Sequence, residues 1–247
     1  MNIVFALIFL IVALLYSLIG FGGGSSYIAF LFLFNIPFEH IPVIALICNL
    51  IVVSGSSFNY LKNKDFSFLK VLPFVVTSIP AAFVAGSINI PKDTFLLVLG
   101  ITLLLAAIRM IIKSREFSSN SSLTNSPHYL FAMFTGLVLG FLSGLVGVGG
   151  GIFLSPIMYN LRWGKAKEIA GICCFFILFN STAGLIGQFQ KGLSFSIVES
   201  YWTLFLAVFI GGLIGSYFGT TKLKPRYIQI LTSVLILFVS LRILFFT

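Results

Sequence analysis

Long apolar runs separated by short polar breaks extend along the whole chain. They fall at residues 3–19, 26–35, 42–60, 70–88, 94–112, 129–146, 152–161, 169–189, 198–218 and 227–246. A helix needs about 20 apolar residues to cross ~30 Å of hydrocarbon, whereas a membrane β-barrel would show ~10-residue stretches of alternating polarity. These runs do not alternate. The pattern therefore predicts an all-α polytopic integral membrane protein.

Two of the apolar stretches are interrupted by glycine. "GFGGGSS" occupies residues 20–26 and "GVGGG" occupies residues 147–151; we call residues 20–24 and 147–151 the first and second glycine loops. Each is followed by an apolar run of ten residues, which as a helix is only ~15 Å long, about half the hydrocarbon thickness. Each loop is therefore predicted to be the tip of a hairpin whose returning arm is a half-helix.

The two halves of the chain align at an offset of 127 positions, without a gap from residue 20 to residue 68. The four glycines of the first loop, Gly20, Gly22, Gly23 and Gly24, fall on Gly147, Gly149, Gly150 and Gly151. Further along, "KNKDFSF" lies over "FQKGLSF" and shares its lysine, serine and last phenylalanine. This register predicts an internal duplication, with one membrane repeat at 1–112, a Ser- and Asn-rich linker at 113–128 and a second repeat at 129–247.

The charges predict how the repeats are oriented. The chain is 59% hydrophobic, 9% charged and carries a net charge of +9, and its Lys and Arg residues gather in the breaks between runs. Successive breaks are poor, rich and poor in basic residues in the first repeat, but rich, poor and rich in the second. Under the positive-inside rule the repeats are then inverted relative to each other, an arrangement found in secondary transporters. Each repeat is expected to hold a glycine hairpin and three further transmembrane helices.

The environment of the chain follows from the same charges. The charged residues form no basic run that would bind nucleic acid. The expected partners are the lipid bilayer and a small anionic substrate. The oligomeric state is left open. The first run has no basic residues before it and no cleavage motif, and it is expected to remain in the mature protein. A multi-pass protein of the cell (plasma) membrane is predicted.

The glycine loops are the candidate binding site. Glycine permits the positive φ angles of a tight reversal and lets a ligand approach the backbone, and each half-helix presents the N–H groups of its N-terminus, which favour an anion. Both loops are expected near the midplane, with polar side chains of the following helices around them. The predicted substrate-binding residues are Gly22, Gly23, Gly24, Ser25, Asn49, Gly149, Gly150, Gly151, Asn180 and Gln188.

The remaining polar residues exclude other functions. No carboxylate lies deep in an apolar run and no histidine lies in one, so we expect no enzyme, no catalytic residue, no metal site and no cofactor. The three cysteines, Cys48, Cys173 and Cys174, lack metal-ligand spacing and are interpreted as packing residues. An anion channel and a non-transporting membrane scaffold remain alternatives to a transporter. A channel would show no counterflow exchange, and a scaffold would show no stabilisation by a ligand.

Both halves also resemble a known family. "GFGGG" with "NIPFEHIPVIALICNLIVVSGSSFNYLKNKDFSF", and "GLVGVGGGIFLSPIMYN" with "GQFQKGLSF", resemble the repeated pattern of the TauE/SafE sulfite exporter family. The resemblance covers essentially the whole chain. It implies a transporter of sulfite, a sulfonate, thiosulfate or a related sulfur anion that works without ATP, and the family's name makes export the first hypothesis. The inverted repeats predict that the transporter works by alternating access. The resemblance leaves open which anion is carried, the direction of transport and the coupling ion.

Overall fold

The computed structural model describes residues 3–18, 20–63, 67–113, 129–161, 163–164, 166–191, 196–218, 237–238, 240–241 and 243–245. Within these ranges the chain folds into helices joined by short turns, without a β-strand. The labelled helices are α1 (Ile3–Leu18), α2 (Gly24–Leu33), α3 (His40–Asn63), α4 (Phe68–Ser87), α5 (Lys92–Lys113), α6 (Tyr129–Val146), α7 (Gly151–Asn160), α8 (Ala166–Phe189), α9 (Ser196–Ser200) and α10 (Trp202–Phe218). The all-α prediction is confirmed.

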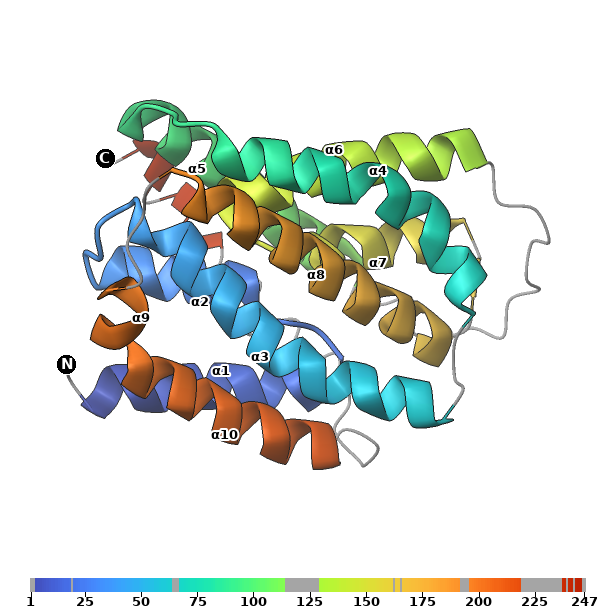
Figure 1. Cartoon of the computed structure of the whole chain (residues 1–247), viewed down its shortest axis with the longest axis horizontal. Coiled ribbons are helices and arrows are strands. Elements are labelled where there is room, and N and C mark those ends of the chain that lie inside the picture. The colour runs from blue at the N-terminus through green and yellow to red at the C-terminus, as the bar shows by residue number, and fades with distance from the viewer. Residues whose placement is uncertain are drawn as a thin grey trace.

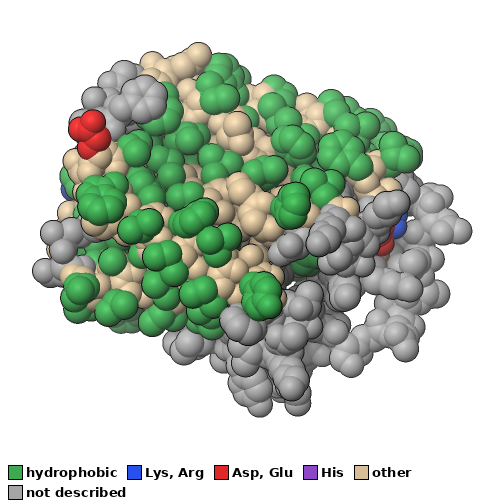
Figure 2. Space-filling model, turned by 60° about the horizontal axis from the view of Figure 1, so that its bottom comes forward, with side chains coloured by type: hydrophobic (Ala, Val, Ile, Leu, Met, Phe, Trp, Pro, Cys, Tyr) green, Lys and Arg blue, Asp and Glu red, His purple; other side chains and the backbone are tan. Residues whose placement is uncertain are grey.

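The outside of the molecule is suited to lipid. Five stretches in the described helices are long and apolar enough to cross a membrane: His40–Phe58, Phe68–Ser87, Tyr129–Val146, Glu168–Phe189 and Val198–Tyr217. Large apolar side chains point outward from several helices, as at Leu7, Val76 and Phe134, which are 52%, 55% and 66% exposed. Figure 2 shows such side chains covering most of one face. A surface of this kind is stable in a bilayer rather than in water, and the protein is a polytopic membrane protein.

Two central helices and two flanking pairs make up most of the bundle (Figure 1), and α5 packs against α6 and α7. Helices α3 and α8 pack against each other at the centre. On one side α4 packs along both α8 and α6, and on the other side α10 packs along both α3 and α1. The short helices follow the same plan, since α2 lies against α3 and α7 against α8. The glycine loops are thereby held between the two central helices.

Glycines let the flanking helices approach closely. Gly136, Gly140 and Gly144 recur every four residues along α6, and a Cβ on any of them would collide with the backbone of α4. On the other flank, Gly211 and Gly215 of α10 meet the backbone of α1 in the same way. Small residues at such spacing allow close backbone contact between helices, which is the main source of association inside a membrane.

The predicted runs correspond to the observed helices with one difference. The half-helices predicted at 26–35 and 152–161 are α2 and α7, each of 10 residues. The run predicted at 198–218 is instead divided into α9 and α10 at Tyr201, whose carbonyl accepts the first hydrogen bonds of α10. The predicted linker lies outside the described residues except for Lys113. Of the run predicted at 227–246, the described residues are helical and the rest lie outside the description.

Candidate anion site between the glycine loops

The first glycine loop reverses the chain at the end of α1. The N–H of Phe21 donates to the carbonyl of Tyr16 at 3.0 Å, and the N–H of Gly20 donates to the carbonyl of Ser17 at 3.2 Å. This pair of bonds is a Schellman motif, which needs a left-handed residue after the helix. Gly20 supplies it with a φ of 77°, and Gly23 has a φ of 87° just before α2 begins. Glycine is therefore required here by the backbone itself.

The second glycine loop ends α6 with a related motif. The N–H of Gly147 donates to the carbonyl of Ser143 at 2.8 Å, and Gly147 has a φ of 89°. A single bond of this type closes a helix when the next residue is left-handed. Gly149 and Gly150 follow with φ values of 81° and 74°. The expectation that the glycines adopt positive φ in a tight reversal is confirmed in both loops.

Each loop leads directly into the N-terminus of a half-helix. The carbonyls of Gly23 and Gly150 accept hydrogen bonds from the N–H groups three and four residues later, at 3.0 to 3.1 Å. These two glycines are therefore the N-caps of α2 and α7. The first N–H groups of each helix have no acceptor within the helix, and the terminus carries roughly half a positive charge. Two such termini begin at the glycine loops.

Asn49 of α3 lies between the two loops. Its side chain is completely buried, and its Nδ2 donates to the carbonyl of Gly147 at 3.3 Å. A Cβ added to Gly22 would lie 2.5 Å from Asn49 Oδ1, and one added to Gly24 would lie 2.6 Å from Nδ2. In the second loop, a Cβ on Gly149 would lie 2.8 Å from the same Nδ2. One amide therefore contacts both loops, and the absence of side chains from the glycines makes room for it.

The loops also contact each other directly. A Cβ on Gly24 would lie 2.5 Å from the carbonyl oxygen of Val148. Ile177 of α8 touches both loops, because its Cγ2 lies 3.3 Å and 3.1 Å from the positions of a Cβ on Gly22 and Gly149. The two glycine loops, 127 residues apart in sequence, thus meet at one place with α3 on one side and α8 on the other.

Some predicted site residues lie against the loops and others only near them. Gly23 faces the rings of Tyr16 and Tyr27, and a Cβ on Gly150 would lie 2.8 Å from the ring of Phe176. These two glycines therefore face aromatic packing. A Cβ on Gly151 would meet the side chain of Ile177, which also touches Gly22 and Gly149.

The three other predicted polar residues differ in their surroundings. Ser25 is buried in the first turn of α2. Asn180 is completely buried, one helical turn from Ile177 on α8. Gln188 is also buried, but its Nε2 donates to the carbonyl of Gly144 at 2.9 Å, so it is already paired with the last turns of α6. Asn49 and Asn180 are thus better placed to bind a solute than Gln188.

Unpaired polar atoms lie on the helices around the two loops. Among the described residues, the buried side-chain oxygen and nitrogen atoms without a hydrogen-bond partner are Tyr27 Oη, His40 Nδ1, Asn49 Oδ1, Ser143 Oγ, both amide atoms of Asn180 and Ser181 Oγ. Leaving such an atom unpaired in the interior costs about 1–3 kcal/mol. Buried polar groups in native proteins are nearly always satisfied by protein, water or ligand. These atoms therefore have hydrogen-bonding capacity that the described protein atoms leave unused.

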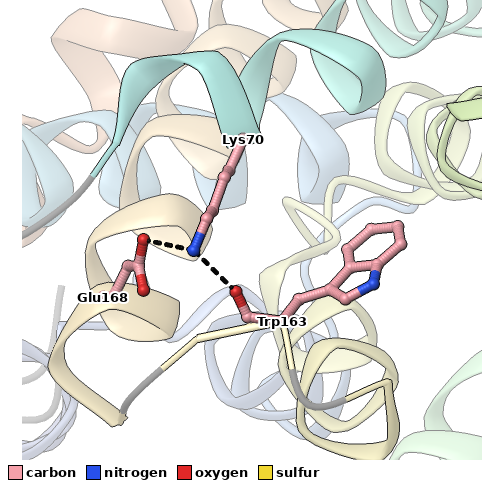
Figure 3. Close-up of polar contacts among 3 residues, drawn as sticks. All are labelled: Lys70, Trp163 and Glu168. Carbon is pink, nitrogen blue, oxygen red and sulfur yellow. Dashed lines mark hydrogen bonds and ion pairs between the residues drawn. The ribbon is translucent and has the colours of Figure 1, made fainter. Parts of the chain in front are cut away.

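Charged side chains stand at the ends of the helices instead of at the loops. Lys70 Nζ at the start of α4 lies 2.8 Å from Glu168 Oε1 at the start of α8, and it also donates to the carbonyl of Trp163 at 2.9 Å (Figure 3). After α8, partial burial lowers the pKa of Lys191. The side chains that the loop glycines contact are neutral. Their electrostatics come from peptide dipoles and amide groups.

Two contact residues were missed by the sequence reasoning. Ile177 is an apolar residue within an apolar run, and Val148 is the one apolar residue of the second glycine loop, so nothing in the local pattern marks either as a contact residue. Their role depends on where α3 and α8 cross, which only the folded structure specifies. The alignment at offset 127 does carry one signal in retrospect, since it places Phe176 opposite Asn49. The two halves of the site are thus chemically unequal.

Comparison with known proteins agrees with this architecture. The sequence pattern described as "Sulfite exporter TauE/SafE" matches residues 5–243. The chain is 33% identical over 240 residues to the "Probable membrane transporter protein y4hK" of Sinorhizobium fredii, covering 97% of this chain and 96% of that one. It is 23% identical over 257 residues to the "Probable membrane transporter protein YunE" of Bacillus subtilis, covering 93% and 92%. No solved structure matches the chain significantly.

The fold and its relatives define the class of protein. A bundle of apolar helices with two buried glycine loops, similar over nearly its whole length to membrane transporter proteins, is a multi-pass membrane transporter and not an enzyme. Because the family pattern spans almost the entire sequence, the chain belongs to the TauE/SafE sulfite exporter family. The family resemblance inferred from the repeated motifs is confirmed.

Proposed function

We propose that this protein is a secondary transporter that exports a small sulfur-containing anion, such as sulfite, a sulfonate or thiosulfate, across the cell membrane. The anion binds at the midplane between the two glycine loops. Backbone N–H groups at the start of α2 and α7 bind its oxygens, with Asn49 between the loops and Asn180 beside them. The sulfur-containing class comes from the family's name, and the oxyanion chemistry comes from the donors present.

The single observation that carries the proposal is the position of Asn49. Its buried amide contacts glycines of both loops, so the two helix N-termini begin close to one point. An anion between them would interact favourably with two partial positive charges in a low-dielectric interior, without a buried basic side chain. Such neutral binding favours a small oxyanion that accepts several hydrogen bonds at once.

The packing of the helices supports inverted repeats of residues 1–112 and 129–247. At the offset of 127, α1 corresponds to α6, α2 to α7, α3 to α8, and α4 to the segment of α9 and α10. The packed pairs α1–α10 and α6–α4 then correspond to each other, as do α2–α3 and α7–α8. The pair α3–α8 corresponds to itself and would lie on a pseudo-two-fold axis. Two such halves can exchange conformations and open a central site to each side in turn.

Counterflow in proteoliposomes tests the proposal. Vesicles loaded with unlabelled sulfite and diluted into labelled sulfite should accumulate the label transiently, because a carrier exchanges anions across the membrane. Asn49→Leu, which keeps the side-chain shape and removes the amide, should lower this exchange at least tenfold. Gly55→Ala is the matched control, since a Cβ there meets nothing closer than 3.5 Å and should leave exchange unchanged.

The same assay separates the alternatives. Flux of label without counterflow would contradict the carrier mechanism and identify an anion channel. Absence of flux and of stabilisation by sulfite, sulfate, thiosulfate, sulfoacetate and taurine, in a folded protein, would contradict anion transport and favour a scaffold. Equal exchange by wild type and Asn49→Leu would show that the anion does not bind at Asn49 between the glycine loops.

A further inference from the structure

We propose that buried oxygens beside the C-terminal end of α6 form a binding site for a small monovalent cation, with sodium as the first candidate. The juxtaposition that carries the proposal is the convergence of unpaired side-chain oxygens from α3, α6 and α8 at that helix end. This site goes beyond the proposed function, because it does not depend on which anion the protein carries.

The end of α6 is wedged between the two central helices. A Cβ on Gly147 would lie 2.8 Å from Cα of Pro42 in α3. A Cβ on Gly184 of α8 would lie 3.0 Å from Cα of Gly144 and 3.5 Å from Leu46 Cδ1. These contacts fix the faces that surround the end of α6. On α3 the face continues one turn beyond Leu46 to Asn49, and on α8 it continues one turn before Gly184 to Asn180 and Ser181.

Oxygens without partners lie on these faces. Asn49, Ser143, Asn180 and Ser181 are each 0% exposed. Among the described residues, Asn49 Oδ1, Ser143 Oγ, Asn180 Oδ1 and Ser181 Oγ find no hydrogen-bond partner. Four oxygens from three helices therefore have lone pairs available to bind a ligand. A cation binds to such lone pairs, whereas an anion would need the hydroxyl protons and amide N–H groups.

The equivalent residues of the first half do not share this condition. Tyr16, which corresponds to Ser143, has its hydroxyl 2.9 Å from Ser26 Oγ. Ser54, which corresponds to Ser181, is exposed and donates to the carbonyl of Leu50 at 2.6 Å. Unpaired hydroxyls are therefore not a general consequence of the repeat. Ser143 and Ser181 are unpaired where their first-half equivalents are bonded, and the unpaired hydroxyl of Tyr27 in the first half has Leu154 at its equivalent position.

The charge distribution favours a cation at this end. The C-terminus of a helix carries roughly half a negative charge, and in transporters the ends of broken helices and unwound carbonyls hold coupling cations. Among the described residues, no group of His, Cys, Asp and Glu side chains could hold a metal ion. Divalent ions such as calcium and magnesium bind mainly through carboxylates. Four neutral oxygens therefore suit a monovalent ion.

The cation and the anion would lie at opposite ends of the same short loop. The second glycine loop joins the C-terminus of α6 to the N-terminus of α7. A cation at the first terminus and an anion at the second would stabilise each other by direct attraction. Asn180, with both amide atoms unpaired, could contact the cation through Oδ1 and the anion through Nδ2. Each ion is then expected to increase the affinity for the other.

Thermal unfolding of the purified protein tests the cation site without any transport substrate. The melting temperature is measured in sodium, potassium or choline chloride at one chloride concentration, so that any effect of chloride is constant. At ten times the dissociation constant, sodium or potassium should raise the melting temperature by about 3–6 °C over choline. The increase should saturate as a single site. Equal melting temperatures in all three salts, at every salt concentration in which the protein stays soluble, would overturn the proposal.

Two neighbouring residues on α8 provide the variant and its control. Ser181→Ala removes a buried hydroxyl without a partner, so it should fold normally in choline and lose most of the sodium-dependent increase. Thr182→Ala removes an exposed hydroxyl that donates to the carbonyl of Leu178 at 2.8 Å, and it should keep the full increase. An increase that survives Ser181→Ala, Ser143→Ala and Asn180→Ala would place the cation elsewhere. Because these readouts need no anion flux, they can fail while the anion transporter stands, and the reverse.

Discussion

The two glycine loops are built alike, but the polar groups beside them are satisfied differently. Next to the first loop, the hydroxyl of Tyr16 is bonded to Ser26 and the hydroxyl of Ser17 donates to the carbonyl of Gly212 at 2.8 Å. Next to the second loop, the hydroxyl of Ser143 and the amide of Asn180 have no partner among the described residues. The hydroxyls on the helix before the first loop are thus paired within the protein, whereas the hydroxyl of Ser143 on the helix before the second loop is not; Tyr27 Oη, which follows the first loop, is also unpaired.

The helices that lead into the two loops are held differently. The hydrogen bonds of Tyr16 and Ser17 hold the end of α1 against α2 and α10. At the end of α6, the hydroxyl of Ser143 makes no such bond among the described residues. Ile177 contacts both loops, so the apolar contacts do not separate them. The two loops thus share positive φ angles and differ in the hydrogen bonding of the helix that precedes each.

The largest effect is expected at Gly149, where both the positive φ and the neighbouring side chain of Asn49 require glycine. Gly149→Ala forces an L-residue into a φ of 81° and places its Cβ 2.8 Å from Asn49 Nδ2. Strain and overpacking together should lower the free energy of unfolding by about 2–4 kcal/mol and abolish anion binding. Thermal unfolding and anion titration measure both. Gly55→Ala should instead be neutral or stabilise α3 by up to about 1 kcal/mol, and a similar loss in both variants would contradict this account.

A pair of hydroxyl deletions breaks the comparison between the loops directly. Tyr16→Phe removes one partner of a buried hydrogen bond and leaves Ser26 unsatisfied, which should cost about 1–3 kcal/mol of unfolding free energy. Ser143→Ala, at the equivalent position, removes a hydroxyl that has no partner. Measured in choline chloride, it should change stability by no more than about 0.5 kcal/mol. If the two deletions cost the same, the loops do not differ in the way described.

A small effect is also expected at the ion pair between α4 and α8. The side chains of Lys70 and Glu168 are 37% and 18% exposed, so solvent and salt screen their attraction. Lys70→Met should cost no more than about 1 kcal/mol, and less at high salt. A double-mutant cycle with Glu168→Gln measures the coupling. Anion affinity should remain unchanged in both variants, because the pair does not contact the loops; a large loss of affinity would connect this end to the site.

The helices and loops could be predicted because their signals are local. A triple glycine between apolar runs specifies both the reversal and the start of a half-helix, and the residues of α2 and α7 agree with this to within about two positions. The break at Tyr201 could not be foreseen, because no glycine or proline marks it. At the break, the carbonyl of Tyr201 accepts the first hydrogen bonds of α10, and the ring of Tyr201 packs against His40 at a centroid distance of 6.2 Å.

The candidate site could be predicted only in part, because its contacts are tertiary. Asn49 stood out as an amide in an apolar run, and the structure brings it to both loops. Gln188 stood out for the same reason, yet it is paired with the carbonyl of Gly144. Whether an amide faces a loop or a helix end depends on the rotation and crossing of α3 and α8. The sequence determines these through side-chain packing along the full length of both helices, which has no local signature.

The central claim is that the two glycine loops form a single anion site at Asn49, and binding stoichiometry tests it most directly. Isothermal titration of sulfite into the purified protein, with Asn49→Leu and Gly55→Ala measured alongside, gives the number of sites and their affinity. The account predicts one anion per chain, unchanged in Gly55→Ala and lost in Asn49→Leu. Two anions per chain, or one whose affinity is unaffected by Asn49→Leu, would contradict it.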